Sequence, residues 1–162
     1  MRKEYILTII ISFLILSLIG CTKSENVNTI SPFNDIPISS TKRIEFSNLT
    51  ITSEEKELGR SKMVTGEDDI QKIGEYLKTI TCTERKDKNI KSDFEISFLK
   101  SSENEKIYLY TIGVSYNGIY VYKYSDTDTV KLVYTDADIT IIDELKSLYD
   151  DMNYKEELLM RK

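Results

Sequence analysis

The sequence predicts an α+β fold: a single small domain in which an antiparallel sheet of about four to five strands packs against two helices. Several segments alternate apolar and polar residues, which is the pattern of a strand with one wet face. Two others repeat apolar residues every three or four positions, which is the pattern of an amphipathic helix. Because strands and helices follow one another without a repeat or a break, we expect one core and one α+β domain in residues 43–162.

The expected elements follow in chain order. A strand is expected in 43–51, where Ile44 and Phe46 alternate with polar residues. A helix is expected in 65–81, where Thr65 and Asp68 have the spacing of a capping pair and acidic residues suit the first turn. Its apolar face holds Ile70, Ile73, Leu77 and Ile80. The remaining elements are a strand in 93–99, a hairpin in 107–125, a strand in 129–136 and a helix in 138–152, while the polar segment 54–64 is ambiguous.

The hairpin is expected to turn at Asn117-Gly118, since a tight turn needs positive φ at its centre. A two-residue turn there would pair Tyr116 with Ile119 and Val114 with Val121. A four-residue loop would keep the same residues on the same faces. The expected core face holds Tyr110, Ile112, Val114 and Val121. The opposite face holds Tyr120, Tyr122 and Tyr124, paired with Ser115, Gly113 and Thr111.

The first twenty residues have the layout of a secretory signal peptide. Arg2 and Lys3 lie beside the amino terminus, and residues 5–20 then run without a charge. A helix that crosses the hydrocarbon core needs about 20 apolar residues. This run is shorter, so we expect residues 1–20 to be a cleaved leader rather than a membrane span.

The uncharged run ends in Leu18-Ile19-Gly20-Cys21, which resembles the lipobox of bacterial lipoproteins. In proteins with this motif a diacylglycerol is attached to the cysteine sulfur, and a peptidase cuts before that cysteine. The resemblance implies lipidation at Cys21 and a location on the extracytoplasmic face of the cell membrane. Two acyl chains hold a protein stably on a bilayer, whereas one does not. The alternative is a leader or short anchor in which Cys21 is incidental.

Residues 21–42 are expected to be the lipidated cysteine and a flexible tether. They are rich in Ser, Asn and Thr, contain Pro32 and Pro37, and show no sustained apolar period. The order of leader, tether, strand, helix and meander is similar to that of small uncharacterised lipoproteins of Gram-positive (Firmicute) bacteria. That resemblance implies no activity and no site residues.

Composition argues against several classes of function. The chain contains no histidine, so Ser-His-Asp catalysis and histidine-ligated zinc are both excluded. Its net charge of −5 repels a phosphate backbone, and no basic stripe offsets that repulsion, so no nucleic-acid partner is expected. No catalytic motif is recognisable, and we expect neither an enzyme nor a cofactor or metal.

Some residues still have the chemistry of a site. Cys82 has no internal partner once Cys21 is lipidated, and we expect it to be a small buried residue rather than a nucleophile. Two Asp-x-Asp pairs, at 126–128 and 136–138, fit a turn and a helix cap better than calcium ligands. Carboxylates at 67–69 and 150–151 fit helix ends better than an acid/base pair.

The tyrosines are the most informative candidate. Tyrosines on an accessible sheet face suit recognition of a protein or a glycan, because the ring packs and the hydroxyl forms hydrogen bonds. The sequence therefore predicts a membrane-anchored extracytoplasmic lipoprotein that acts as a binding or interaction module through Tyr120, Tyr122 and Tyr124. Strand propensity, or a helix covering this face, would explain the same pattern. A small envelope enzyme using carboxylates, and an immunity or structural lipoprotein without a small ligand, are the alternative functions.

Overall fold

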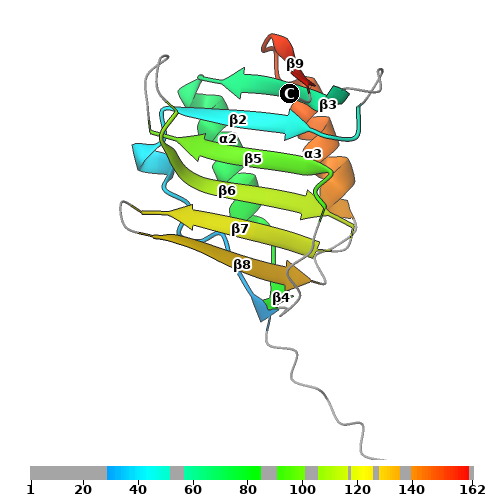
Figure 1. The fold of residues 1–162 in the computed structure, drawn as a ribbon. Coiled ribbons are helices and arrows are strands. Elements are labelled where there is room, and N and C mark those ends of the chain that lie inside the picture. Colours follow the sequence, from blue (N-terminus) through cyan, green and yellow to red (C-terminus); the bar gives the residue numbers. More distant parts are fainter. Residues whose placement is uncertain are drawn as a thin grey trace, which may run out of the picture.

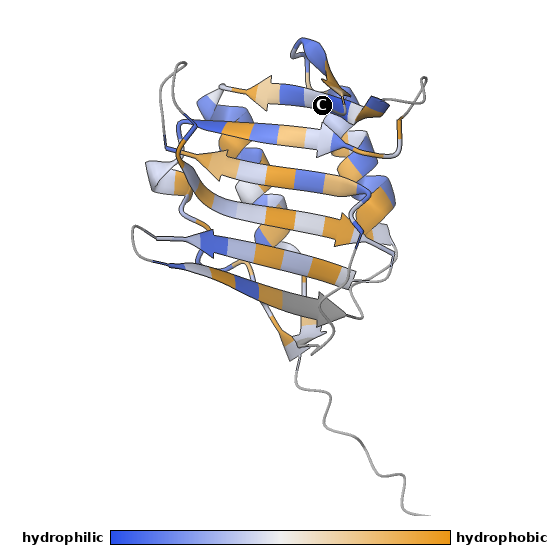
Figure 2. Cartoon of the chain, viewed as in Figure 1, coloured by the Kyte–Doolittle hydropathy of each residue, from blue (hydrophilic) through white to orange (hydrophobic). Residues whose placement is uncertain are grey.

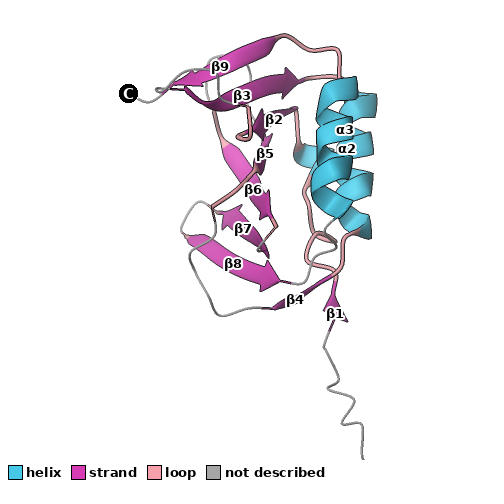
Figure 3. Cartoon of the chain, turned by 90° about the vertical axis from the view of Figure 1, so that its right-hand side faces the viewer, coloured by secondary structure: helices cyan, strands magenta, loops and turns pink. Residues whose placement is uncertain are grey.

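Two helices pack on one face of a strongly twisted antiparallel sheet in the computed structural model (Figures 1 and 3). The structure describes residues 29–51, 57–84, 91–100, 106–116, 118–125, 128–135 and 140–160. The expected leader and Cys21 lie outside these ranges.

The described residues form nine strands in one sheet, in the order β1-β4-β8-β7-β6-β5-β2-β3-β9. Every neighbouring pair is antiparallel. The strands are β1 (Thr29–Ile30), β2 (Arg43–Asn48), β3 (Glu57–Val64), β4 (Cys82–Glu84), β5 (Phe94–Leu99), β6 (Tyr108–Ser115), β7 (Gly118–Tyr124), β8 (Thr129–Thr135) and β9 (Glu156–Met160). The helices are α2 (Glu67–Thr79), α3 (Thr140–Asp151) and the short 3₁₀ helix η1 (Ile38–Ser40).

The predicted α+β fold with four to five strands is wrong, because the domain is mostly sheet. The five expected strands are present as β2, β5, β6, β7 and β8, and β3 and β9 extend this part of the sheet to seven strands. A short ribbon of β1 and β4 then joins β8 through only two residue pairs. The added strands are short, or they carry polar or exposed side chains on both faces, so they lack the alternation from which a strand is predicted.

The core lies between the helices and the facing side of the sheet. The two expected helices are present, and α2 buries Ile70, Ile73 and Leu77 as predicted. Along the strands, apolar and polar residues alternate in the colouring of Figure 2. The largest fully buried side chains of the sheet on this side are Ile44, Phe46, Phe94, Ile96, Phe98, Ile112 and Ile119. The expected capping pair does not form, because Gly66 is the residue before the first helical turn and no side chain caps it.

The expected tether is wrong for residues 29–42, which belong to the folded domain. Phe33 is fully buried in the core, and the Tyr110 hydroxyl donates a hydrogen bond to the carbonyl of Pro32. Further along, η1 lies against α2 at Gly74, where a Cβ atom would overlap the Ile38 side chain. The apolar residues of this segment stand singly in the sequence, and Ile36 and Ile38 lie beside α2, so the segment has neither a helical nor a strand period.

One end of α3 depends on a buried lysine from β3. The Nζ of Lys62 donates hydrogen bonds to the carbonyls of Tyr149, at 2.7 Å, and Met152, at 2.8 Å, and it lies 4.6 Å from the centroid of the Tyr149 ring. The last turn of α3 contains no basic residue of its own. The ammonium group therefore supplies the positive charge that a helix carboxyl end favours. It is a second, charged donor to two carbonyls that also accept backbone N–H bonds, from Met152 and Tyr154.

The same end of the helix layer is tied together by Tyr154. Its hydroxyl accepts a hydrogen bond from the backbone N–H of Gly66 and donates one to the carboxylate of Asp69, both at the start of α2. Burial and the bond to Asp69 raise the pKa of Tyr154. The residues that connect α3 to β9 thus also fix the amino end of α2.

The buried core residues and the nine strands that the structure describes lie between residues 29 and 160. A chain of residues 22–162, called the leaderless chain below, therefore contains the whole described domain. Among the described residues, no helix combines the length and apolarity needed to cross a bilayer.

The Lys62 contact can be tested with Lys62→Met, which keeps an unbranched stem and removes the ammonium group. We expect the free energy of unfolding to fall by about 2–3 kcal/mol, because two carbonyls lose a charged donor. Urea unfolding of the leaderless chain measures this. The control is Lys72→Met on the exposed side of α2, which should change stability by less than about 0.5 kcal/mol. Equal stability of the two variants would contradict the capping role.

Candidate binding surface

The sheet face opposite the helices carries a row of four tyrosines, which we call the tyrosine row. It consists of Tyr120, Tyr122 and Tyr124 from β7 and Tyr108 from β6. Neighbouring ring centroids are 5.3 Å apart for Tyr120 and Tyr122, 6.3 Å for Tyr122 and Tyr124, and 5.8 Å for Tyr124 and Tyr108. Both described α-helices lie on the other face of the sheet (Figure 3). Tyr122, Tyr124 and Tyr108 are half-buried, so part of each ring faces outward.

The alternation along β7 explains why three of these rings share a face. Ile119, which precedes Tyr120, and Val121, which lies between Tyr120 and Tyr122, are fully buried in the core. The predicted core residues Tyr110, Ile112, Val114 and Val121 are confirmed, each with at most 2% of its surface exposed. The faces of the hairpin were therefore predicted correctly from period two.

The predicted pairing within the hairpin is wrong by two residues. Ser115 pairs with Gly118, and Asn117, on which the turn was expected to centre, lies outside the described residues. Gly118 opens β7 with a φ of +148°, a conformation that favours glycine. Because the shift is an even number of residues, every side chain keeps its face, while Tyr120 moves opposite Gly113 and Tyr122 opposite Thr111.

The ring of Tyr120 lies flat over Gly113. A Cβ atom at Gly113 would come within 2.1 Å of the Tyr120 Cζ, so only glycine leaves room for the ring. Tyr120 is consequently only 7% exposed. Its hydroxyl donates a short hydrogen bond to the Glu95 carboxylate and accepts one from Ser92 at 2.9 Å. Burial, followed by the bond to Glu95, raises the pKa of Tyr120, which holds the phenol neutral.

Charged side chains flank the more exposed part of the row. The Nζ of Lys131 lies 5.1 Å from the ring centroids of both Tyr120 and Tyr122, within cation–π distance. At the other end, Lys106 and Glu45 form an ion pair at 2.9 Å beside Tyr108. Burial and the negative charge of Glu45 raise the pKa of Tyr108. The surface thus combines aromatic faces, phenol hydroxyls, a lysine and carboxylates, which suit packing and directional hydrogen bonding.

Sequence reasoning missed Tyr108, because a β-bulge changes its face. Tyr108 and Tyr110 are two residues apart and would share a face in a regular strand. The register with β5 shifts between Phe98 and Leu99, so that Tyr108 pairs with Leu99 while Tyr110 pairs with Phe98. The extra residue, Leu109, sends the Tyr108 ring to Tyr124 while Tyr110 stays in the core. No feature of the local sequence marks this bulge.

The acidic candidates that the structure describes do not assemble into a metal or acid/base site. Among the described residues, no group of three or more Cys, Asp or Glu side chains could hold a metal ion. Asp128 belongs to a turn in which its backbone carbonyl accepts a bond from the Ser125 N–H. Glu67 and Asp68 lie exposed in the first turn of α2, and Asp150 and Asp151 lie exposed at the end of α3. Asp126, Asp136 and Asp138 fall outside the described residues.

Cys82 lies in β4 and is 1% exposed, as expected for a structural cysteine. Burial raises the pKa of its thiol to about 12. The thiol is therefore protonated at neutral pH and is a poor nucleophile there.

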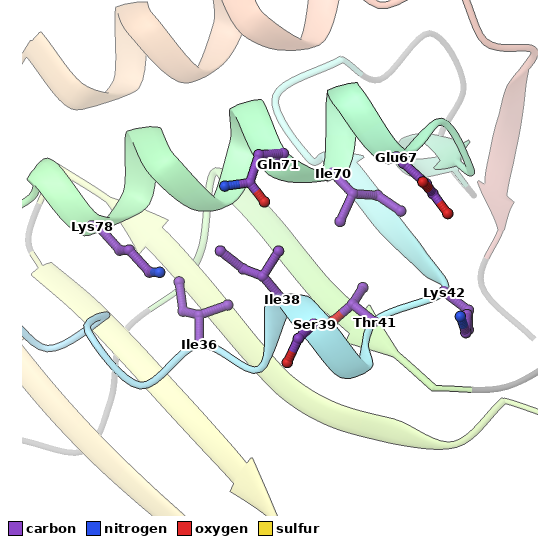
Figure 4. Close-up of a pocket in the computed structure, with 9 residues that line it drawn as sticks. All are labelled: Ile36, Ile38, Ser39, Thr41, Lys42, Glu67, Ile70, Gln71 and Lys78. Atoms are coloured by element: carbon purple, nitrogen blue, oxygen red, sulfur yellow. The ribbon is translucent and has the colours of Figure 1, made fainter.

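A hollow of about 490 Å³ lies beside α2, where η1 crosses it (Figure 4). Ile36 and Ile38 of the N-terminal segment face Ile70 and Gln71 of the helix, while Glu67 and Lys78 lie toward opposite ends (Figure 4). Its charged groups do not converge on one point, so this hollow lacks the arrangement expected of a catalytic site.

Comparisons with known proteins give no family assignment: no protein-family model, curated protein or solved structure matches this chain. The function of the tyrosine row has to be argued from its own chemistry.

The structure separates the tyrosines by burial, and this can be tested with two single substitutions in the leaderless chain. Tyr120→Ala removes a buried ring and leaves a gap above Gly113, so we expect it to cost about 3–5 kcal/mol of stability. Tyr122→Ala truncates a half-exposed ring and should cost about 1 kcal/mol. Urea unfolding of both variants measures the difference. Similar losses would contradict the assignment of Tyr120 to the interior and Tyr122 to the surface.

Proposed function

We propose that this chain is a lipoprotein of the cell envelope, anchored through Cys21, whose domain binds envelope polysaccharide through the tyrosine row. The observation that carries the proposal is the position of the row on the sheet face opposite the helices, with three of its four rings only partly covered. Rings needed only for stability would be expected in the core, where the helices could cover them.

The chemistry of this face favours a glycan over a protein. Sugar rings place their C–H faces on aromatic rings, and their hydroxyls bond to phenols and carboxylates such as those of Tyr108, Glu45 and Glu95. A protein partner would favour a dry apolar centre. Three of the exposed apolar side chains, Leu58, Leu158 and Met160, lie instead on β3 and β9, at one edge of the sheet. The net charge of −5 also disfavours an anionic polymer such as nucleic acid.

The anchor rests on the leader sequence. A basic start, an uncharged run and Leu18-Ile19-Gly20-Cys21 occur in the order that export and lipidation require. Between Cys21 and Thr29, where the described domain begins, seven residues remain as a link. A link this short would keep the domain close to the membrane surface.

The anchor is tested by expressing the full chain in a bacterium that processes lipoproteins and feeding it a labelled fatty acid. We expect the wild-type chain to take up the label and Cys21→Ser to lose it and keep its leader. The matched control is Cys82→Ser, which changes the other of the two cysteines and should be labelled as strongly as wild type. A wild-type chain without label would overturn the anchor.

Glycan binding is tested by co-sedimentation of the leaderless chain with protease-treated cell-wall sacculi. We expect Tyr122→Ala combined with Tyr124→Ala to weaken binding by about tenfold or more, because aromatic anchors dominate binding energies. The control is Tyr116→Ala, since Tyr116 is 64% exposed in the hairpin loop and lies outside the row. It should bind as wild type does.

Two outcomes would overturn the glycan assignment. One is the absence of any binding to sacculi by a folded wild-type chain. The other is binding to untreated sacculi but not to protease-treated sacculi, which would point to a protein partner. Binding that is lost equally in the Tyr116→Ala control would show that the row is not the contact surface.

A further inference from the structure

Glu95 of β5 lies beside the tyrosine row, on the same face of the sheet. It pairs with Gly113 of β6, and Gly113 pairs with Tyr120 of β7, so the three residues form one line across neighbouring strands. Because Gly113 has no side chain, the Tyr120 hydroxyl reaches over it to the Glu95 carboxylate. This half-buried carboxylate is therefore held in place at the Tyr120 end of the row.

One oxygen of the Glu95 carboxylate keeps its capacity to bind a ligand. The hydrogen bonds that Glu95 accepts from described residues come from Tyr120 and, at 3.3 Å, from Ser92, and both end on Oε1. An ionised carboxylate has about four acceptor sites on its two oxygens, so Oε2 can accept further bonds. Glu45, the other carboxylate beside the row, differs because Lys106 Nζ lies 2.9 Å from both of its oxygens.

A lysine places a charge of the opposite sign at the same rings. Lys131 comes from β8, which lies on the other side of β7 from β5. Its Nζ is 5.1 Å from the ring centroids of both Tyr120 and Tyr122. A carboxylate and an ammonium group therefore flank this part of the row. A charged ligand of either sign would be attracted by one of these groups and repelled by the other.

An uncharged polyol can meet both groups without this conflict. A sugar hydroxyl donates to a carboxylate and accepts from an ammonium group, so neighbouring hydroxyls of a glycan can serve Glu95 and Lys131 together. The half-buried Tyr122 ring offers the aromatic surface on which the C–H groups of the sugar can pack. The net charge of −5 adds a general repulsion for a polyanion.

We infer that the tyrosine row selects uncharged glycan strands over anionic envelope polymers, and that Glu95 and Lys131 determine this specificity. The inference rests on the proposed function, because it concerns the ligand of the same surface. Oε2 of Glu95 accepts a bond from a sugar hydroxyl, Lys131 donates one to a sugar oxygen, and Tyr122 supplies the packing surface. Polymers linked by phosphate bind less well.

The test is co-sedimentation of the leaderless chain with two preparations of protease-treated sacculi. One preparation is otherwise intact, and the other is stripped with hydrofluoric acid, which removes phosphate-linked polymers and leaves the glycan strands. We expect the wild-type chain to bind the stripped sacculi at least as tightly as the intact ones. A loss of about tenfold or more on stripping would overturn the inference, because the anionic polymer would then supply most of the binding energy.

Two charge variants test the residues. Glu95→Gln keeps an oxygen for the Tyr120 hydroxyl but replaces the second acceptor with an amide donor, so we expect binding to stripped sacculi to weaken by about tenfold. Its loss on intact sacculi should be smaller, because a repulsion of the anionic polymer is removed at the same time. Lys131→Gln should shift the ratio of the two affinities in the opposite direction, since it removes an attraction for that polymer.

The matched control is Glu157→Gln, the same change at an exposed position of β9. It should bind both preparations as wild type does, and urea unfolding checks that all variants remain folded. Unchanged ratios in both Glu95→Gln and Lys131→Gln would overturn the specificity role, because a merely structural loss weakens both affinities equally. A wild-type chain that binds neither preparation would instead refute glycan binding itself.

Discussion

The ammonium group of Lys62 is the contact on which the helix layer depends. It reaches from the sheet to the end of α3, where it donates hydrogen bonds to the backbone carbonyls of Tyr149 and Met152. Asp150 and Asp151 lie in the last turn of this helix. They add negative charge to the carboxyl end of the helix, which already carries the partial negative charge of the helix dipole. The chain then reverses, places Tyr154 against the start of α2 and enters β9 beside β3. One buried cation thus fixes the end of α3 to β3, and the segment that follows contacts α2 and forms β9.

Local patterns in the sequence predicted the elements that alternate or repeat, and they predicted little else. The faces of β7, the apolar stripe of α2 and the buried Cys82 follow from period and composition. The strands β3 and β9 could not be found in this way, because each is stabilised by a partner about a hundred residues away. From the sequence alone, Lys62 of β3 would be expected to face solvent, because the carbonyls that accept its hydrogen bonds lie about ninety residues away.

The tether predicted for the N-terminal segment was wrong in residues 29–42 for a related reason. Its polar composition and two prolines are typical of a tether, yet Phe33 is fully buried in the core. A single large side chain can fix such a segment through one deep contact, which leaves no periodic signal. The candidate surface was predicted in the same uneven way: the alternation placed three tyrosines on one face, whereas the bulge that adds Tyr108 depends on the register with β5.

The open face and the helix face give the sheet two different roles. The helix side supplies stability through large buried side chains, whereas the other side carries rings, hydroxyls and charges over a floor of small residues. Ser97 and Thr111 bond to each other at 2.8 Å in that floor, and Gly113 leaves space for the Tyr120 ring. The half-exposed tyrosines on this side are not part of the described core. Their rings are therefore available to contact a ligand.

The strand order has a mechanical consequence. The described chain begins in β1 at one margin of the sheet and finishes in β9 at the other, eight strand spacings of about 4.8 Å away. Tension between these ends would act across the strands, along the hydrogen bonds, and would open the ladders one after another rather than shear them together. The ribbon of β1 and β4, joined to β8 by two residue pairs, would yield first. A domain held at its N-terminal end and pulled at β9 would therefore lengthen at low force, as a compliant spacer rather than a rigid one.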